Sequence, residues 1–498
     1  MTIITHLING QSFATNGRLS NVFDPSTGQP IRKVEMANKE TVNEAVLAAK
    51  AALPNWKATS TMKRVQILAR FKQLLGENEQ EIINLISQEH GKTREDAAGE
   101  LNRGIESIEY TMAAPEFLKG EHCRNIGSDI DTWSTFHPVG VVAGITPFNF
   151  PAMVPLWMYP LAVVCGNTFV LKPSERDPSS TLLIAELFQQ AGLPKGVLNV
   201  VNGDKEAVDA IIHHPDVKAI SFVGSTPVAE YIYREGAQRG KRIQALGGAK
   251  NHAVLMPDAD LDNAVNALMG AAYGSCGERC MAISVVVCVG NHIADALVEK
   301  IIPKIESLRI GVGSDLNIDM GPLITQAHLE KVQNYITDGI ESGASLLVDG
   351  RKLSQSEKGY FLGGCLFDDV TPSMRIYQEE IFGPVLCIVR VESLEQAISL
   401  INQHEYGNGT CLFTRDGESA RLFSEEIEVG MVGINIPLPV PIAFHSFGGW
   451  KRSLFGDLHA YGPDGVRFYT RRKTITQRWP KKQTDEAAQF AFLNTRKE

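Results

Sequence analysis

The stretch Thr168-Phe-Val-Leu171 is an apolar run that is followed by a segment of helical periodicity near residues 181–191. Two further runs, Val197-Leu-Asn-Val-Val201 and Ala219-Ile-Ser-Phe-Val223, are each followed by a helical segment in the same way. Strands that alternate with helices of this length are typical of a parallel, doubly wound sheet, which binds ligands at the carboxyl ends of its strands. We therefore predict an α/β fold with a ligand site along one edge of the sheet.

The α/β rhythm extends on both sides of this stretch. It begins at Val139-Gly-Val-Val-Ala-Gly-Ile145, after residues 1–40 with the pattern of small strands and residues 38–115 with that of helices. Helical segments near 292–307 and 326–342, with further strands, repeat the rhythm. Because 498 residues exceed the size of a single core, we expect two doubly wound α/β domains.

A third kind of segment lies near the C-terminus, Val466-Arg-Phe-Tyr-Thr-Arg-Arg-Lys-Thr-Ile-Thr-Gln-Arg-Trp479. It combines charged residues with β-branched and aromatic ones. This composition predicts a long strand that forms a sheet edge or pairs with another chain.

Composition excludes several classes of function. The net charge of −9 argues against nucleic acid or an anionic membrane as the main partner. No apolar run approaches the ~20 residues of a membrane span, and Met1-Thr-Ile-Ile-Thr-His6 lacks the features of a targeting signal.

The eight cysteines have no disulfide or zinc spacing, which favours a reducing, cytoplasmic setting. We expect no metal site, since neither Cys276 and Cys280 nor His213-His214 has a further ligand at a suitable spacing.

The stretch Tyr273-Gly-Ser-Cys-Gly-Glu-Arg-Cys280 contains a candidate nucleophile. Gly277 allows a sharp bend before Cys280, and Arg279 supplies a positive charge beside it. A thiolate needs such a charge, a base or helix-end amides to be populated near neutral pH. The alternative is that Cys280 is a small buried core residue.

Two polar motifs follow predicted strands of the first domain. Asn149 stands between prolines and phenylalanines, where its amide could donate to a developing oxyanion or simply serve a turn. Lys172 and Glu175 follow the strand at 168–171, and together they suit the hydroxyls of an adenosine ribose. Glu175 would repel a 2′-phosphate and so favour NAD over NADP, although a solvated ion pair explains the same two residues.

Three further features are open to a functional interpretation. Gly224-Ser225-Thr-Pro opens a predicted helix, where backbone amides bind phosphate, but such turns are common without a ligand. Glu380 and Phe382 lie on a rigid turn. The carboxylate could bind a second ribose, or the segment is an ordinary surface turn with a buried Phe382. Arg103 lies off the apolar stripe of its helix and is most simply a solvated side chain.

Taken together, the motifs resemble the aldehyde dehydrogenase superfamily over essentially the whole chain. They occur in the family's order as Pro147-Phe-Asn149-Phe-Pro, Lys172-Pro-Ser-Glu175, Phe222-Val-Gly224-Ser225-Thr, Leu246-Gly-Gly248, Gly277-Glu-Arg-Cys280 and Glu380-Ile-Phe382-Gly-Pro. The resemblance implies an NAD-binding domain (1–118 and 139–248), a catalytic domain (249–450) and a small β oligomerisation element (119–138 and 466–485).

The family pattern also implies a role for each site residue. Cys280 would be the nucleophile, with Asn149 and the Cys280 backbone amide as the oxyanion hole. Residues implied at the cofactor are Thr146, Phe148, Lys172, Glu175, Gly224, Ser225, Leu246, Gly247, Glu380 and Phe382. Phe150 is implied at the substrate.

One departure from the family pattern carries information. Where the family has Glu-Leu-Gly-Gly, this chain has Ala245-Leu-Gly-Gly248, so the glutamate that would activate water is absent. Ala245, together with Ala249-Lys-Asn-His252 and Gly277-Glu-Arg-Cys-Met-Ala282, resembles the methylmalonate-semialdehyde and malonate-semialdehyde dehydrogenases that acylate coenzyme A. In that group two arginines hold the substrate carboxylate, and they match Arg103 and Arg279.

The resemblance implies a complete reaction. A carboxylated aldehyde would be oxidised on Cys280 with NAD, lose CO₂ and be transferred to coenzyme A, giving acetyl-CoA or propionyl-CoA. One alternative is a hydrolytic NAD-dependent aldehyde dehydrogenase that releases a free carboxylic acid. A second, a non-catalytic member of the fold, is disfavoured by the presence of Cys280 and Asn149. The group is commonly tetrameric, so the resemblance favours a homotetramer, while the residues themselves do not distinguish a dimer from a tetramer.

Overall fold

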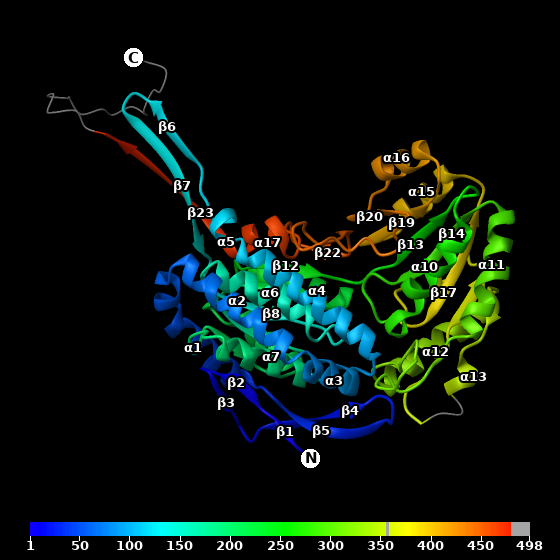
Figure 1. Cartoon of the computed structure of the whole chain (residues 1–498), viewed down its shortest axis with the longest axis horizontal. Helices are drawn as coiled ribbons and strands as arrows, with labels where there is room; N and C mark the ends of the chain where they lie inside the picture. Colours follow the sequence, from blue (N-terminus) through cyan, green and yellow to red (C-terminus); the bar gives the residue numbers. More distant parts are fainter. Residues whose placement is uncertain (355–357, 480–498) are drawn as a thin grey trace.

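The computed structural model describes residues 1–354 and 358–479. Two large α/β units lie side by side, and a slender β-sheet projects from one of them (Figure 1). The predicted α/β class is therefore confirmed. Among the described residues, no helix is both long and apolar enough to cross a membrane.

The first unit contains an eight-stranded sheet, whose central strands from β12 to β10 are parallel. Its spatial order is β22 (Leu454–Phe455), β12 (Arg242–Leu246), β11 (Val217–Val223), β8 (Val141–Ile145), β9 (Thr168–Lys172), β10 (Leu198–Val200), β2 (His6–Ile8) and β3 (Gln11–Phe13). A separate small sheet has the order β1 (Ile3–Ile4), β5 (Gln29–Met36) and β4 (Arg18–Asp24).

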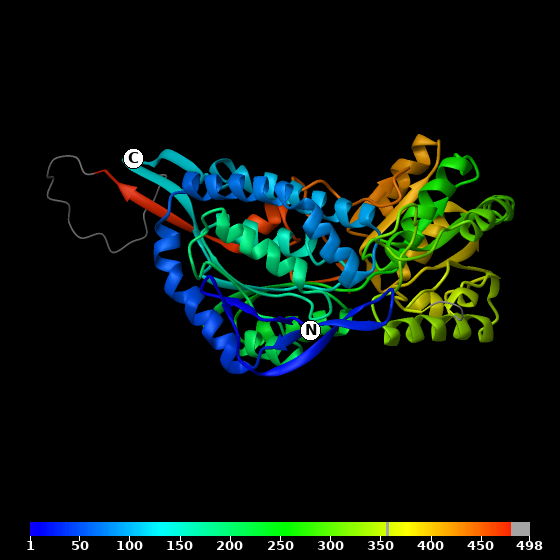
Figure 2. The same cartoon turned by 60° about the horizontal axis from the view of Figure 1, so that its bottom comes forward.

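Helices cover both faces of the eight-stranded sheet (Figure 2). One face carries α2 (Thr61–Glu77), α3 (Glu79–His90), α4 (Arg94–Met112), α6 (Met153–Val164) and α7 (Ser179–Gln190); the other carries α1 (Lys39–Ala58), α8 (Lys205–His213) and α9 (Thr226–Gln238). Successive side chains of a strand point to opposite faces. Accordingly, Phe169 and Leu171 pack on the α7 side, whereas Val170 packs on the α1 side.

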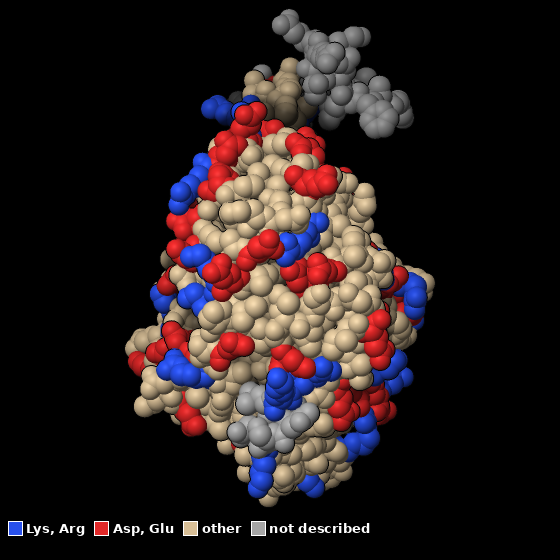
Figure 3. All heavy atoms as spheres, turned by 90° about the vertical axis from the view of Figure 1, so that its right-hand side faces the viewer, with Lys and Arg blue, Asp and Glu red and all other residues tan. Residues whose placement is uncertain are grey.

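The second unit contains a seven-stranded sheet that is parallel except for β15. Its order is β15 (Ser345–Val348), β16 (Cys365–Asp368), β17 (Val385–Val391), β14 (Ile283–Val289), β13 (Asn251–Leu255), β19 (Gly409–Phe413) and β20 (Met431–Ile434). Its longer helices are α10 (Leu261–Tyr273), α11 (Asn291–Glu306), α12 (Gln326–Glu341), α15 (Leu394–Gln403) and α16 (Gly417–Glu426), and two short ones are α13 (Arg351–Ser354) and α14 (Arg375–Gln378). On the outer face of this unit, acidic and basic side chains are interspersed (Figure 3).

The projecting sheet has three antiparallel strands in the order β23 (Thr470–Arg478), β7 (Ile130–Pro138) and β6 (His122–Gly127). One prediction is wrong here, because residues 466–469 are not part of the strand. They end helix α17 (Gly462–Tyr469), which begins with Pro463 in its first turn and packs on α6. Burial of Val466 and Tyr469 in this helix outweighs their β-propensity. Residues 480–485 lie outside the described residues.

Candidate active site

The loop between α10 and β14 (residues 274–282) contains the candidate nucleophile Cys280 and is called the nucleophile loop. Ser275 and Cys276 adopt φ values of 52° and 54°, and Gly277 follows at 71°. A Cβ on Gly277 would lie 2.3 Å from the carbonyl oxygen of Gly383, so only glycine fits this close approach. The loop is thereby held against the segment that carries Glu380 and Phe382.

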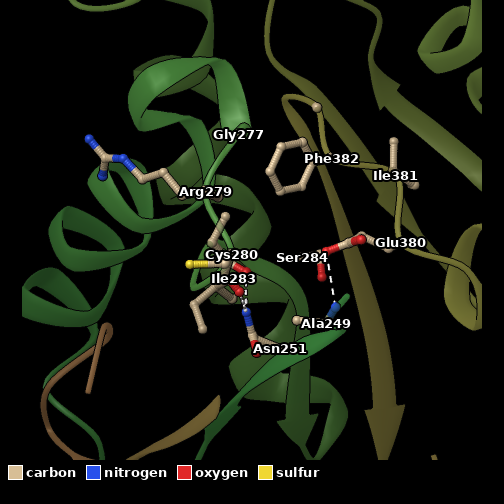
Figure 4. A pocket seen from close by; sticks show the side chains of 13 residues that line it. Ala249, Asn251, Gly277, Arg279, Cys280, Ile283, Ser284, Glu380, Ile381 and Phe382 are labelled. Atoms are coloured by element: carbon tan, nitrogen blue, oxygen red, sulfur yellow. Dashed lines mark hydrogen bonds between the residues drawn. The ribbon is translucent and has the colours of Figure 1, made fainter. Parts of the chain in front are cut away.

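Cys280 is partly buried and lies in a pocket formed by this loop and the 380–383 turn (Figure 4). Its backbone carbonyl accepts hydrogen bonds from Asn251 Nδ2 at 2.9 Å and Asn408 Nδ2 at 3.1 Å. Burial raises the pKa of the Cys280 thiol to about 12; the charge of Glu380 acts in the same direction, and that of Arg279 opposes it. The thiol is therefore protonated at neutral pH, and a nucleophilic role for Cys280 would require removal of its proton.

Arg279 lines the same pocket, but its guanidinium lies away from the Cys280 sulfur (Figure 4). It is ion-paired with Asp96 of α4 and donates to the carbonyl oxygen of Gly270 at 3.3 Å. Asp96 also accepts a hydrogen bond from the backbone N–H of Ser275 at 3.1 Å. One carboxylate thus ties α4 to both the loop and its arginine, and the sequence contained no signal for this contact.

Asn149 is buried, and its side-chain amide reaches the nucleophile loop. Nδ2 donates to the carbonyl oxygen of Glu278 at 3.0 Å. An amide nitrogen carries two N–H donors, so this bond leaves the second one unused. The neighbouring Phe150 packs under the Lys92 ammonium, which lies 4.4 Å from the ring centroid.

Glu278 is a buried acid that sequence reasoning missed. Its carboxyl group lies 3.6 Å from His328 Nε2 and 3.9 Å from His90 Nε2, and it accepts a hydrogen bond from the Ile324 N–H at 3.3 Å. Burial raises the pKa of Glu278 to about 8. A sequence motif does not reveal such a group, because its neighbours come from two distant segments, near residue 90 and at residues 324–328.

Arg103 lies in a different hollow from Cys280. Its guanidinium pairs with Glu106 and donates to the carbonyl oxygens of Val440 and Pro441 at 3.2 and 3.0 Å. The hollow is lined by Arg103, Glu106, Ser107, Trp157, Pro441, Ala443 and Tyr461. Burial raises the pKa of Tyr461, and the charges of both Arg103 and Cys280 contribute smaller effects. Tyr461 thus lines the hollow of Arg103 and also feels the charge of Cys280.

Residues predicted at an adenosine ribose lie together after β9. Lys172 Nζ is 3.1 Å from Glu175 Oε2 and donates to the Gly203 carbonyl oxygen at 2.5 Å. Although burial raises the pKa of Glu175, Lys172 and the surrounding hydrogen bonds outweigh it, so the pKa lies below its ordinary value. Glu175 is therefore ionised at neutral pH and available to accept hydroxyl donors.

The helix start at Gly224-Ser225 lies at the carboxyl end of β11, next to that of β12. Ser225 is exposed and makes no side-chain cap for α9, and the Gly224 N–H bonds to the Leu246 carbonyl oxygen at 3.1 Å. Gly247 follows β12, where its N–H donates to Ser453. The arrangement brings the start of α9 and both glycines to one edge of the sheet.

The remaining predicted cofactor residues come from both units. Thr146 follows β8, and its Oγ1 is buried without a hydrogen-bond partner among the described residues. The rings of Phe148 and Phe382 meet edge to face at 6.0 Å. Glu380 accepts a hydrogen bond from the Ala249 N–H at 3.0 Å, and burial raises its pKa to about 7.

Ala245 is fully buried in β12 and packs in the apolar cluster beneath α9. Its strand neighbours in register are Phe222 and Phe455. The position where the family has a glutamate is therefore a methyl group among apolar side chains.

A family model described as the aldehyde dehydrogenase family matches residues 13–475. The chain belongs to the aldehyde dehydrogenase family. The predicted resemblance is thus confirmed, and the protein is an enzyme of this oxidoreductase family.

Three relatives of this aldehyde dehydrogenase give a more specific comparison than the family model does. A Pseudomonas aeruginosa protein named malonate-semialdehyde dehydrogenase is 71% identical over 494 residues, covering 99% of each chain. The crystal structure of a methylmalonate-semialdehyde dehydrogenase from Oceanimonas doudoroffii is 63% identical, with a TM-score of 0.96 over 97% of this chain and 99% of that one. A Sinorhizobium meliloti structure in complex with NAD is 54% identical, with a TM-score of 0.95 over 97% and 99% of the two chains.

Proposed function

We propose that this enzyme oxidises malonate semialdehyde or methylmalonate semialdehyde with NAD, removes CO₂ and transfers the acyl group to coenzyme A. The observation that carries the proposal is a thiol and an arginine in one pocket, combined with a methyl group at position 245. The first two suit an aldehyde that carries a carboxylate, and the third removes the usual base for hydrolysis. The names of the relatives support the same substrates.

The residues present fit NAD. Ionised Glu175 with Lys172 suits the adenosine ribose, and the uncapped start of α9 at Ser225 suits a diphosphate. Buried Thr146 Oγ1 lacks a partner among the described residues, and Glu380 and Phe382 lie beside Cys280. When bound, NAD supplies the hydride acceptor. The NAD complex of the Sinorhizobium meliloti relative supports this assignment.

Oxidation begins at Cys280. Its thiol releases its proton to solvent, and the thiolate attacks the aldehyde carbon. The new oxyanion receives hydrogen bonds from the free Asn149 N–H and the Cys280 backbone amide. Arg279 and Arg103 orient the substrate carboxylate, because a guanidinium fork matches that group. Phe150 packs against the substrate chain. Loss of hydride from the same carbon leaves a thioester on Cys280.

Decarboxylation and transfer follow from the thioester. Its carbonyl accepts the electron pair of the breaking C–C bond as CO₂ leaves, and protonation of that carbon completes the acyl group. Coenzyme A then attacks the thioester through its thiolate and expels the Cys280 thiolate, which takes up a proton again. A thiolate needs less help from a base than water does. The buried methyl group of Ala245 favours this acceptor over water.

We further assign residues 1–118 and 139–248 to NAD binding, 249–450 to catalysis, and 119–138 with 466–485 to oligomerisation. Among the described residues β23 is an edge strand of its sheet and most of its side chains are exposed, which supports pairing with another subunit; a homotetramer is the proposed state. The eight cysteines lie unpaired, which supports a cytoplasmic location.

Product analysis tests the function. Purified enzyme is mixed with NAD and malonate semialdehyde, with and without coenzyme A, and acetyl-CoA, acetate, CO₂ and NADH are measured. We expect acetyl-CoA and CO₂ in equal amounts with NADH, and turnover that stalls without coenzyme A. Steady release of acetate in its absence would instead support the hydrolytic alternative, with another carboxylate as the base.

A further inference from the structure

Lys92 and Glu100 form an ion pair whose two side chains are completely inaccessible to solvent. Lys92 Nζ lies 2.7 Å from Glu100 Oε2, and the exposure of each side chain is 0%. Lys92 lies in the loop between α3 and α4, and Glu100 is in the second turn of α4. Burial of two charges is costly unless every donor and acceptor is used well, so this pair calls for an explanation.

Each remaining polar contact of the pair reaches the segment that starts at Asn149. Lys92 Nζ donates to the Asn149 carbonyl oxygen at 2.6 Å, and the ammonium group also lies against the Phe150 ring. Glu100 Oε1 accepts the backbone N–H groups of Ala152 and Met153 at 2.7 and 3.1 Å. The pair thus holds residues 149, 150, 152 and 153 from one side.

The other side of Asn149 faces the nucleophile loop, where Nδ2 bonds to the Glu278 carbonyl oxygen. Asn149 is therefore fixed at two points, its main chain by Lys92 and its side chain by Glu278. An oxyanion donor is effective only when its position is set before the charge develops. The same buried ammonium also places a positive charge at the peptide that carries this amide.

We propose that Lys92 and Glu100 are positioning residues, which set the Asn149 amide for the oxyanion formed on Cys280. The inference rests on the proposed role of Asn149 in aldehyde oxidation. The pair touches neither Cys280 nor the arginines in the described contacts, so it acts through the Asn149 segment.

The test uses the variant Lys92→Met/Glu100→Gln in the full-length enzyme. Methionine keeps most of the lysine stem, and the glutamine oxygen continues to accept the Ala152 and Met153 N–H groups, so packing is conserved while both charges are removed. We expect the single-turnover rate of NADH formation to fall about 10- to 100-fold, with malonate semialdehyde and propanal affected equally. NAD affinity and alkylation of Cys280 by iodoacetamide should change less than about twofold, because neither requires an oxyanion donor.

A double-mutant cycle with Asn149→Ala distinguishes positioning from general damage. Asn149→Ala alone should lower the rate about 10²- to 10³-fold. Adding the Lys92 and Glu100 substitutions to it should change the rate by less than about twofold, since their effect passes through the missing amide. Arg390→Met/Asp368→Asn removes an ion pair between β16 and β17, far from this segment, and is the matched control.

Each outcome decides a different point. Fully additive losses, or an equal fall in NAD affinity and Cys280 alkylation, would overturn the positioning role. An unchanged rate in Asn149→Ala would instead overturn the proposed role of Asn149. If the double variant does not fold, Glu100→Gln alone is put through the same cycle, and its non-additivity with Asn149→Ala decides.

Discussion

Asp96 ion-pairs with Arg279 across the boundary between the two α/β units. It lies in the first turn of α4, and the same helix contributes Glu100 and Arg103 at spacings of four and three residues. Side chains at these spacings lie on one face of a helix. A single face of α4 therefore contacts Arg279 beside Cys280, bonds to the segment after Asn149 through Glu100, and carries Arg103.

Substitution of either arginine should separate binding from chemistry. Arg103→Leu or Arg279→Leu is expected to raise KM for malonate semialdehyde about 10- to 100-fold and to leave KM for propanal within about threefold, since only the former has a carboxylate. Steady-state kinetics with both aldehydes measure this. Arg94→Leu, on the same helix but bonded to Asn84 and Gln80, is the control. Equal losses for the two aldehydes would contradict a carboxylate clamp.

Removal of the candidate nucleophile should abolish oxidation. Cys280→Ser is expected to lower the rate of NADH formation more than ~10³-fold, because a hydroxyl is far less nucleophilic than a thiol near neutral pH. Cys276→Ser is a matched control from the same loop, whose thiol is buried and has its pKa raised by burial. Stopped-flow absorbance of NADH provides the measurement. Retained activity in Cys280→Ser would exclude thioester chemistry at this residue.

Glu175 should govern the choice between NAD and NADP. Its carboxylate is ionised beside Lys172 and would repel a 2′-phosphate. Glu175→Gln is expected to lower the ratio of kcat/KM for NAD over NADP about tenfold or more. Glu186→Gln, on α7 and outside the proposed site, should leave the ratio unchanged. An unaltered ratio in Glu175→Gln would place the discrimination elsewhere.

Glu380 should make NAD binding depend on pH. Burial raises its pKa to about 7, so the carboxylate that can accept two ribose hydroxyls forms as the pH rises through this value. We expect the Kd for NAD to fall about three- to tenfold between about pH 6 and 8, and Glu380→Gln to bind NAD weakly with a flat profile. Calorimetric titration measures both. The same slope in wild type and Glu380→Gln would assign the dependence to another group.

The same carboxyl group should affect stability in the opposite direction. Its folded pKa lies above the unfolded value, so the folded state binds more protons between pH 4.5 and about 7. Stability from this group is therefore present at low pH and is lost as the pH rises through that window. Glu380→Gln should reduce the decline in Tm across the window, and an unchanged decline would argue against the raised pKa.

Strand β23 should be required for assembly. Most of its side chains are exposed, and Ile475 pairs in register with Trp133 of β7. Ile475→Pro removes a strand N–H and is expected to shift the oligomer toward smaller species. Light scattering after size-exclusion chromatography measures the mass. Lys473→Ala, in the same strand, should keep the wild-type mass; an unchanged mass in Ile475→Pro would contradict assembly through this strand.

The C-terminal segment shows where sequence reasoning about the fold was insufficient. Residues 466–469 have β-prone side chains, yet they end helix α17. Gly462 and Pro463 provide a local helix start, and the contact of Gly465 with Leu161 requires close packing on α6. Local propensity was therefore overridden by burial that only the folded chain provides.

The sequence by itself determined the two doubly wound units, because alternation of apolar runs and helical periodicity is a local property. It also indicated the candidate groups at Cys280, Asn149, Lys172 and Glu380, whose short motifs are contiguous. Only the tertiary structure decided what supports them. Lys92 meets Asn149 from 57 residues away and Asp96 meets Arg279 from 183 residues away. Contacts over such separations depend on how α4 and the loop before it pack against α3 and α6 and reach the loop of Cys280.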